Sequence, residues 1–198
     1  MTTEEVHFFD KLSETWDAHE IRSTPVKIRQ FMDIVSLKDG MSVLDLGTGT
    51  GVLIPFLSQA VGPKGRVAAV DVSEGMLSKA IEKYGRLDNV TFKKIDFEEQ
   101  DLTDRFDVIF LYCVYPHIHF PERTLKKLTA DNLNEGGRII VAFPSDENFI
   151  NNVHKERKAE SDLLPPAPAL AKRFRAWGLD SRVRAYSPDL YVVEVRKY

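Results

Sequence analysis

A short run of alternating glycines constrains this chain most. Gly47, Gly49 and Gly51 follow directly on residues 43–46, which are apolar apart from Asp45, and a helix-like pattern begins after them. Glycine lets the backbone turn sharply and approach a ligand closely. The free amides at the start of the next helix add a positive field. The pattern therefore predicts a strand, a tight loop and a helix that together hold a nucleotide-like ligand.

The spacing of these glycines narrows the class of ligand. Dinucleotide folds prefer G-x-G-x-x-G, which cradles a pyrophosphate, whereas this loop reads G-x-G-x-G directly after Asp45. A carboxylate there would repel a pyrophosphate but suits a cationic ligand. No lysine follows the glycines, which excludes a P-loop NTPase. A nicotinamide-dependent oxidoreductase remains an alternative class.

Two different periodicities organise the chain. From residue 41 onward, short apolar runs alternate with helical patterns, which predicts a parallel sheet covered on both faces. The last two strands read as a hairpin, so one strand is expected to be antiparallel. Strands are predicted at 42–46, 66–72, 90–95, 106–111, 138–143, 181–186 and 190–196, and helices at 6–16, 25–35, 52–60, 74–84, 122–131, 146–160 and 169–177. Turns are predicted at 62–65, 98–102 and 135–137, and a proline-rich connector at 164–168.

A second acid stands at the end of the next predicted strand. Asp71 lies twenty residues after Gly51, where an acid can bind both ribose hydroxyls of an adenosine. Its alternative is a capping role, because Ser73 precedes a predicted helix.

A third acid closes the strand after that. Asp96 could accept a hydrogen bond from an adenine amino group, and Phe97 could supply a backbone amide or an apolar wall. Met76 could pack on the other face of the adenine.

Four segments together resemble the class I S-adenosylmethionine (SAM)-dependent methyltransferases: VLDLGTGTG, AAVDVSEGML, NVTFKKIDF and FDVIF, within residues 41–143. The resemblance implies an α/β Rossmann-like three-layer sandwich with a seven-stranded sheet in the order 3-2-1-4-5-7-6, the last strand antiparallel. It implies SAM as cofactor and S-adenosylhomocysteine as product. One domain is expected, residues 1–198, with a helical lid at 1–38 and the core at 39–198. The expected cofactor-binding residues are Asp45, Gly47, Thr48, Gly49, Gly51, Asp71, Val72, Met76, Asp96, Phe97 and Leu111.

The segment after the fourth strand, residues 111–120, is expected to face the methyl acceptor, because ligands bind beyond the carboxyl ends of the strands in open α/β sheets. It lacks the Asn/Asp-Pro-Pro-Tyr-type motif of many nitrogen methyltransferases acting on nucleic acid or protein. We therefore expect direct SN2 transfer to a small molecule, with no nucleic-acid partner. The residues expected to contact the acceptor are Tyr112, Tyr115, His119 and Trp16.

A pair of histidines in this segment leaves three interpretations open. His117 or His119 could be a general base near neutral pH, and we choose His117 because it lies closer to the strand end. They could instead anchor the loop, or bind a metal together with His154. We expect no metal ion at this site.

Composition excludes several other classes. The chain has 198 residues, 43% hydrophobic and 29% charged, with a formal net charge of −3. This balance gives no general attraction to nucleic acid or anionic membranes, and no apolar run is long enough to span a bilayer. The acidic start predicts no signal peptide, and the single cysteine, Cys113, fits a reducing compartment, so a cytoplasmic location is expected.

Some alternatives stay open at this level. Residues 151–198 hold ten Lys or Arg against six Asp or Glu, which indicates either solvated helix faces or a preference for an anionic substrate. The oligomeric state is undetermined, with a homodimer as one option. A non-catalytic SAM-binding module or regulatory subunit would carry the same glycine loop, and aminopropyl transfer would need carboxylates that residues 112–120 lack.

Overall fold

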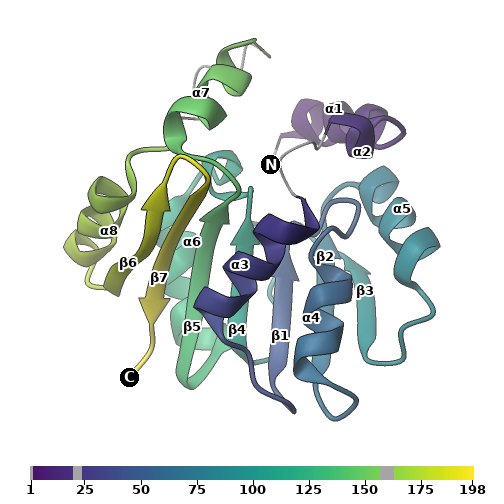
Figure 1. Ribbon diagram of the computed structural model, residues 1–198, viewed down its shortest axis with the longest axis horizontal. Coiled ribbons are helices and arrows are strands. Elements are labelled where there is room, and N and C mark those ends of the chain that lie inside the picture. The colour runs from purple at the N-terminus through teal and green to yellow at the C-terminus, as the bar shows by residue number, and fades with distance from the viewer. Residues whose placement is uncertain (1, 20–23, 157–162) are drawn as a thin grey trace.

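The protein is described by a computed structural model that covers residues 2–19, 24–156 and 163–198. A seven-stranded sheet in the order β3-β2-β1-β4-β5-β7-β6 forms its centre (Figure 1). Strands β1 to β5 pair in parallel, and β7 is antiparallel to both β5 and β6. This order confirms the predicted fold class. The strands are β1 (Ser42–Leu46), β2 (Arg66–Asp71), β3 (Val90–Lys94), β4 (Phe106–Tyr112), β5 (Leu133–Phe143), β6 (Asp180–Ser187) and β7 (Leu190–Arg196).

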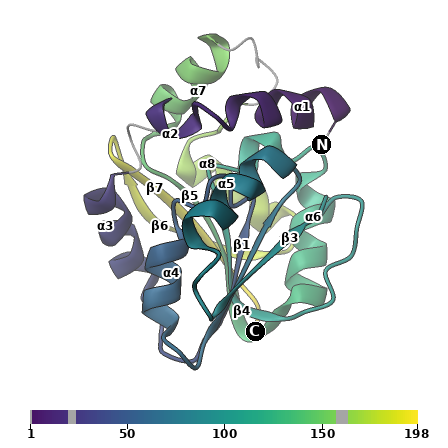
Figure 2. The ribbon, with the colours of Figure 1, turned by 90° about the vertical axis from the view of Figure 1, so that its right-hand side faces the viewer.

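Helices cover both faces of the sheet, as Figure 2 shows. One face carries α3 (Pro25–Val35), α4 (Ile54–Val61) and α5 (Glu74–Tyr84), and the other carries α6 (Pro121–Lys127) and α8 (Ala167–Ala176). Three further helices lie beyond the carboxyl ends of the parallel strands: α1 (Thr3–Leu12), α2 (Trp16–His19) and α7 (Glu147–Glu156). A 3-10 turn, η1 (Tyr115–His117), follows β4, and a π-helical turn, η2 (Leu128–Asn132), follows α6.

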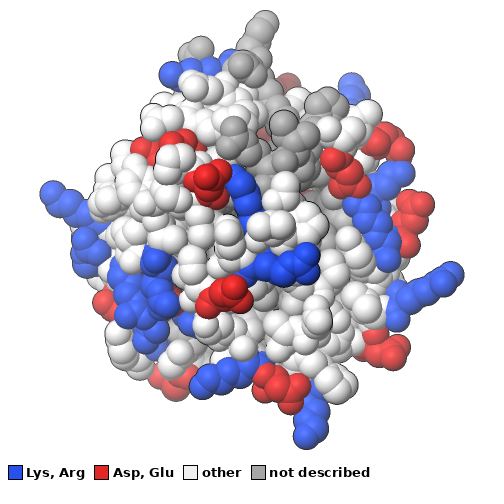
Figure 3. Space-filling model, viewed as in Figure 1, with Lys and Arg blue, Asp and Glu red and all other residues white. Residues whose placement is uncertain are grey.

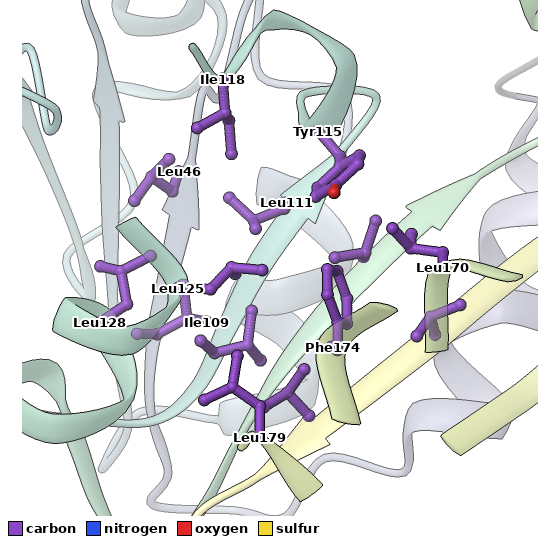
Figure 4. Close-up of a cluster of buried hydrophobic side chains, with 14 of the residues drawn as sticks. Leu46, Ile109, Leu111, Tyr115, Ile118, Leu125, Leu128, Leu170, Phe174 and Leu179 are labelled. Atoms are coloured by element: carbon purple, nitrogen blue, oxygen red, sulfur yellow. The ribbon is translucent and has the colours of Figure 1, made fainter. Parts of the chain in front are cut away.

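Two hydrophobic clusters join these layers. The cluster between the sheet and the α6–α8 layer includes Ile109, Leu125 and Phe174 (Figure 4). The cluster on the other face includes Phe31 of α3, whose ring lies 5.6 Å from that of Phe110. Burying one such side chain contributes about 1.5–3 kcal/mol. Within the predicted 1–38 extension, α3 is therefore part of the core, and only α1 and α2 lie over the strand ends.

Several predicted boundaries were wrong. The predicted helix 6–16 is interrupted between α1 and α2, and the predicted helix 122–131 ends as α6 and continues as the π-helical turn. The predicted turn at 135–137 lies inside β5, where the register with β4 shifts. Gly136, with φ of 73°, allows this irregularity because glycine tolerates a left-handed backbone. The predicted helix 146–160 is α7, and its last residues, 157–160, lie outside the described residues.

Three arginines of the basic C-terminal quarter surround one buried carboxylate, together with Arg138. The carboxylate of Glu194 is 1% exposed and lies within ion-pair distance of four arginines: Arg138, Arg182, Arg184 and Arg196. Two of these guanidinium groups also donate to carbonyl oxygens at the end of α3. Figure 3 shows Lys and Arg side chains gathered over this side of the sheet. These arginines therefore join α3 to the β5–β7–β6 side of the sheet, away from the strand ends where a substrate is expected.

No helix within the described ranges has the length and apolarity needed to cross a bilayer.

Candidate cofactor and acceptor site

The glycine loop after β1 is bound to the neighbouring strand. The amides of Gly47 and Thr48 both donate to the carbonyl of Val70 in β2, at 2.9 Å. A β-carbon added at Gly47 would stand 2.5 Å from Cγ2 of Val114, which follows β4. At Gly49, where φ is 56°, an added β-carbon would meet no described atom within 4 Å. The first glycine thus permits close packing, and at the second no described atom occupies the place that a side chain would take.

The third glycine packs closely against two helices. A β-carbon at Gly51 would lie 2.9 Å from Cδ1 of Ile54 and 2.9 Å from Cδ2 of Tyr84. Gly51 therefore lets the loop lie close to the first residue of α4 and the last residue of α5, and its contact with the cofactor stays a prediction.

Asp71, at the end of β2, joins the two loops that flank this space. Its Oδ2 accepts the amide of Gly49 at 2.7 Å, and its Oδ1 accepts the amide of Ser73 at 2.9 Å. Burial raises the pKa of this carboxyl, against the lowering effect of these hydrogen bonds. Each oxygen retains a further lone pair, so Asp71 can also accept hydrogen bonds from ribose hydroxyls. The helix cap itself is Ser73, whose hydroxyl accepts the amide of Met76.

Asp45, in β1, is the second buried acid of the site. Its side chain is 2% exposed, and its Oδ2 accepts a hydrogen bond from the hydroxyl of Thr48 at 2.6 Å. Burial raises the pKa of Asp45 to about 7, and the nearby charge of Asp71 adds to the rise while the Thr48 hydrogen bond opposes it. A carboxyl in this state gains most from a cationic ligand, which would hold it ionised.

The predicted adenine residues lie at the same edge of the sheet. Asp96 and Phe97 follow β3 directly, and Oδ1 of Asp96 accepts the amide of Glu98 at 3.1 Å. Phe97 and Val72 are half-buried, whereas Met76 is buried in the first turn of α5. Their contacts with adenine stay predictions.

The α1–α2 segment is bound to both cofactor loops. Oδ1 of Asp10 accepts the hydroxyl of Ser73 at 2.5 Å, beside Asp71 in sequence. Oδ1 of Asp17 accepts the hydroxyl of Thr50, in the glycine loop, at 2.6 Å. Sequence reasoning missed both aspartates, because no local pattern distinguishes an acid that reaches across the fold from one on a solvated helix face.

A buried glutamate connects the segment after β3 with the segment after β4. The carboxylate of Glu98, 4% exposed, accepts the amides of His119 and Phe120 at 3.2 and 2.9 Å. The His119 ring lies between Glu98, at 3.4 Å, and Glu5 of α1, at 3.2 Å. His119, predicted to contact the acceptor, thus also links α1 to the loop that follows the adenine residues.

His117 lies within a row of aromatic rings. Its ring centroid is 5.4 Å from that of Phe9 in α1 and 5.2 Å from that of His154 in α7. Phe9 in turn lies 6.0 Å from Trp16. The row Trp16, Phe9, His117, His154 therefore joins α2, α1, η1 and α7. Phe9 was not among the expected acceptor contacts, since its helix spacing is equally typical of a core stripe.

The structure places three other predicted residues in the core. Tyr112 packs with its ring centroid 5.7 Å from that of Phe31, and Tyr115 lies 5.6 Å from Phe174. Leu111 and Tyr115 are surrounded by apolar side chains in Figure 4. Leu111 and Tyr112 are buried because β4 is a central strand covered on both faces. Tyr115, in η1, is buried because it packs against α8. Their contacts with cofactor or acceptor stay predictions.

The histidines do not converge on a shared metal site. His119 is engaged by two glutamates, while His117 contacts His154. In the part of the chain that the structure describes, no group of three or more His, Cys, Asp or Glu side chains could hold a metal ion.

The sheet order, the glycine loop and the acids at the ends of successive strands define the class I SAM-dependent methyltransferases, whose cofactor is SAM. Residues 37–179 match the family model described as a methyltransferase domain. The chain belongs to this methyltransferase family.

Individual methyltransferases are also similar to this chain in sequence or in structure. The chain is 32% identical over 108 residues to the malonyl-[acyl-carrier protein] O-methyltransferase of Anoxybacillus flavithermus, covering 54% of this chain and 40% of that relative. It is 31% identical over 117 residues to a ubiquinone/menaquinone biosynthesis C-methyltransferase of Idiomarina loihiensis, covering 57% and 46%. The chain thus spans less than half the length of these curated relatives. A crystal structure of a SAM-dependent methyltransferase from Aquifex aeolicus is 26% identical, with a TM-score of 0.69 over 86% of this chain and 89% of that one.

Proposed function

We propose that this protein transfers the methyl group of SAM to a small-molecule acceptor. The observation that carries the proposal is the open space over Gly49, flanked by two acids that differ in their surroundings. Asp71 offers oxygen lone pairs to ribose hydroxyls. Asp45, with its pKa raised by burial, favours a cationic group. A ligand that carries both a ribose and a positive charge fits this pair.

Bound SAM would supply a methyl group on a positively charged sulfur. The chain's own residues would orient it: the glycine loop through its backbone, Asp71 through the ribose, and Asp96 with Phe97 through the adenine. The α1–α2 segment would act as a lid, because Asp10 and Asp17 already bind the two loops at the site. A closed lid excludes water and strengthens electrostatic interactions inside the site.

The base in this proposal is His117. It ends the turn that follows β4, on the side of the sheet where acceptors enter in open α/β folds. An imidazole titrates near neutral pH and can take a proton from a hydroxyl or amine as the methyl group arrives.

The small-molecule acceptor rests on two lines of support. Two of the curated relatives are a malonyl-[acyl-carrier protein] O-methyltransferase and a C-methyltransferase of ubiquinone/menaquinone biosynthesis. The net charge of −3 gives no general attraction to polyanions. We place the enzyme in the cytoplasm because its single cysteine fits a reducing compartment, and a homodimer stays an open option.

Methyl-labelled SAM, incubated with the protein and a fractionated metabolite extract, tests the activity. The expected result is one labelled product, absent with the Asp45→Asn/Asp71→Asn double variant as the matched control. S-adenosylhomocysteine should raise the melting temperature of the wild type, and NAD should not. Stabilisation by S-adenosylhomocysteine with no labelled product from any fraction would favour the alternative, a non-catalytic SAM-binding module. Stabilisation by NAD alone would overturn the cofactor assignment.

A further inference from the structure

We infer that His154 is a second proton-handling residue of the acceptor site, paired with His117, and that the acceptor attacks through an O–H or N–H group. This inference rests on the proposed function and names the chemistry of its substrate. Its basis is the contact between the two imidazoles, whose ring centroids are 5.2 Å apart with a 50° angle between the planes.

The pair comes from two neighbouring parts of the sheet. His117 follows β4 through η1, and His154 lies on α7, which follows β5. Strands β4 and β5 are adjacent and parallel, and β4 also pairs with β1, which carries Asp45. The carboxyl ends of these strands meet at one edge, where the cofactor loop lies. The two imidazoles therefore lie on the acceptor side of the predicted methyl donor.

The pair is shielded from solvent on the side of the lid. His154 is 9% exposed, and Phe9 of α1 packs edge-on against His117 with an interplanar angle of 81°. In Figure 1, α7 and the α1–α2 segment rise on either side of the strand ends. An acceptor that enters between them would meet two aromatic side chains of the lid, Phe9 and Trp16, and two imidazoles. Apolar walls with a few placed polar groups are typical of small-molecule sites.

The proton balance gives the pair its role. As the acceptor oxygen or nitrogen forms a bond to the methyl carbon, the carbon–sulfur bond breaks and its electron pair stays on sulfur. The product S-adenosylhomocysteine has a neutral sulfur, so the proton of the acceptor must leave the methylated product. His117 takes this proton and passes it to His154, and His154 releases it to bulk water as the product leaves, so that both imidazoles are neutral before the next transfer. Other charged groups near this segment, Glu5 of α1 and Glu98 after β3, face His119.

Ring-preserving variants test the proton role apart from packing. His154→Phe and His117→Phe keep an aromatic ring in the row and remove the nitrogens, and His7→Phe, on an exposed part of α1, is the matched control. We expect His154→Phe to bind S-adenosylhomocysteine within about twofold of wild type, and to lower kcat for the labelled extract fraction by about 10–100-fold. The pH at which kcat rises should also move. The control should leave all three quantities unchanged.

Full activity of His154→Phe with an unchanged pH profile would overturn the inference, because the ring alone would then suffice. A lower kcat with an unchanged profile would also overturn it and leave a packing role. A readout without any acceptor uses the imidazole NMR signals in the S-adenosylhomocysteine complex. The signal of His154 should titrate at a different pH once His117 is replaced by Phe, and identical titration would show that the rings do not share a proton. Failure of the wild type to label any fraction would count against the proposed function, and the NMR titration still decides whether the pair exists.

Discussion

The hydroxyl of Ser73 donates a hydrogen bond of 2.5 Å to Oδ1 of Asp10, which joins helix α1 to the start of α5. The same oxygen accepts the amide of Gly75 at 3.0 Å. The amide of Ser73 donates in turn to Asp71, the predicted ribose ligand. One buried serine therefore connects the lid with the predicted cofactor site. A substitution that releases the lid is expected to change cofactor affinity as well.

Replacing Asp10 should release the lid. Asp10→Ala removes two hydrogen bonds to a charged acceptor, together worth about 1.5–3 kcal/mol, and should speed tryptic cleavage at Lys11 by about tenfold or more. Glu4→Gln, in the exposed first turn of the same helix, should cleave like wild type. Equal cleavage rates for Asp10→Ala and wild type would show that other contacts hold the lid.

Replacing Asp71 should weaken cofactor binding. Asp71→Asn removes the negative charge and replaces one acceptor oxygen with an NH2 group. Either the loop amides or the ribose hydroxyls then lose a hydrogen-bond acceptor. Calorimetry with S-adenosylhomocysteine should show about 10–100-fold lower affinity, the equivalent of about 1.4–2.8 kcal/mol. Asp88→Asn, on an exposed turn, is the control. An unchanged affinity would remove Asp71 from the site.

Cofactor affinity should depend on pH through Asp45. Because burial raises its pKa to about 7 in the free protein, a cationic ligand must bind the ionised form. The affinity for SAM should therefore fall as the pH drops below about 7, by up to about tenfold per unit. Asp45→Asn should bind weakly and lose this slope, which calorimetry at several pH values can measure. A slope that persists in the variant would assign it to another group.

The same raised pKa has a consequence for the free protein. The pKa of Asp45 is higher in the folded protein than its ordinary value of 3.8, so the folded state binds this proton more tightly than the unfolded state does. The resulting contribution to the free energy of unfolding is complete at pH values below 3.8. This contribution is lost as the pH rises through about 7. Thermal unfolding should show a smaller gain on acidification from about pH 7 to pH 5 in Asp45→Asn than in wild type, and equal gains would contradict the prediction.

Gly47 and Gly136 offer a matched pair for testing the cofactor loop. Both have positive φ, 76° and 73°, so an alanine at either should cost about 1–2 kcal/mol of stability. Only at Gly47 would the new β-carbon also meet Val114, while none of the described atoms lies within 4 Å at Gly136. Gly47→Ala should therefore lower S-adenosylhomocysteine affinity as well, Gly136→Ala should not, and Val114→Ala should restore part of the loss. Equal affinities in the two glycine variants would contradict a role for this close approach.

Local patterns were sufficient for the class of fold. The apolar strands, the helical spacing and the turn residues predicted a parallel sheet between helices with one antiparallel strand, because each signal depends on neighbours close in the chain. The order of the strands was implied by the resemblance to the methyltransferase family, and the structure confirms it. Where local signals conflicted, boundaries were wrong. Gly136 and Gly137 read as a turn, yet the pairing of β5 with β4 keeps them in the strand as an irregularity.

The partners of individual side chains could not be predicted from local patterns. Leu111 and Tyr112 are at the end of β4, where the central position of this strand in the sheet buries them, and Tyr115 of η1 is buried against Phe174 of α8. Their burial depends on which strands and helices pack around them, which only the tertiary structure shows.

The sequence by itself determined the class of fold and the acids at the ends of β1, β2 and β3, because strand, loop and helix are specified by residues near one another. The tertiary structure alone decided which distant groups meet. Asp10 reaches Ser73 across 63 positions, and His117 meets His154 from another helix. Such contacts depend on the packing of helices over the sheet, and packing is a property of the whole chain that no local pattern records.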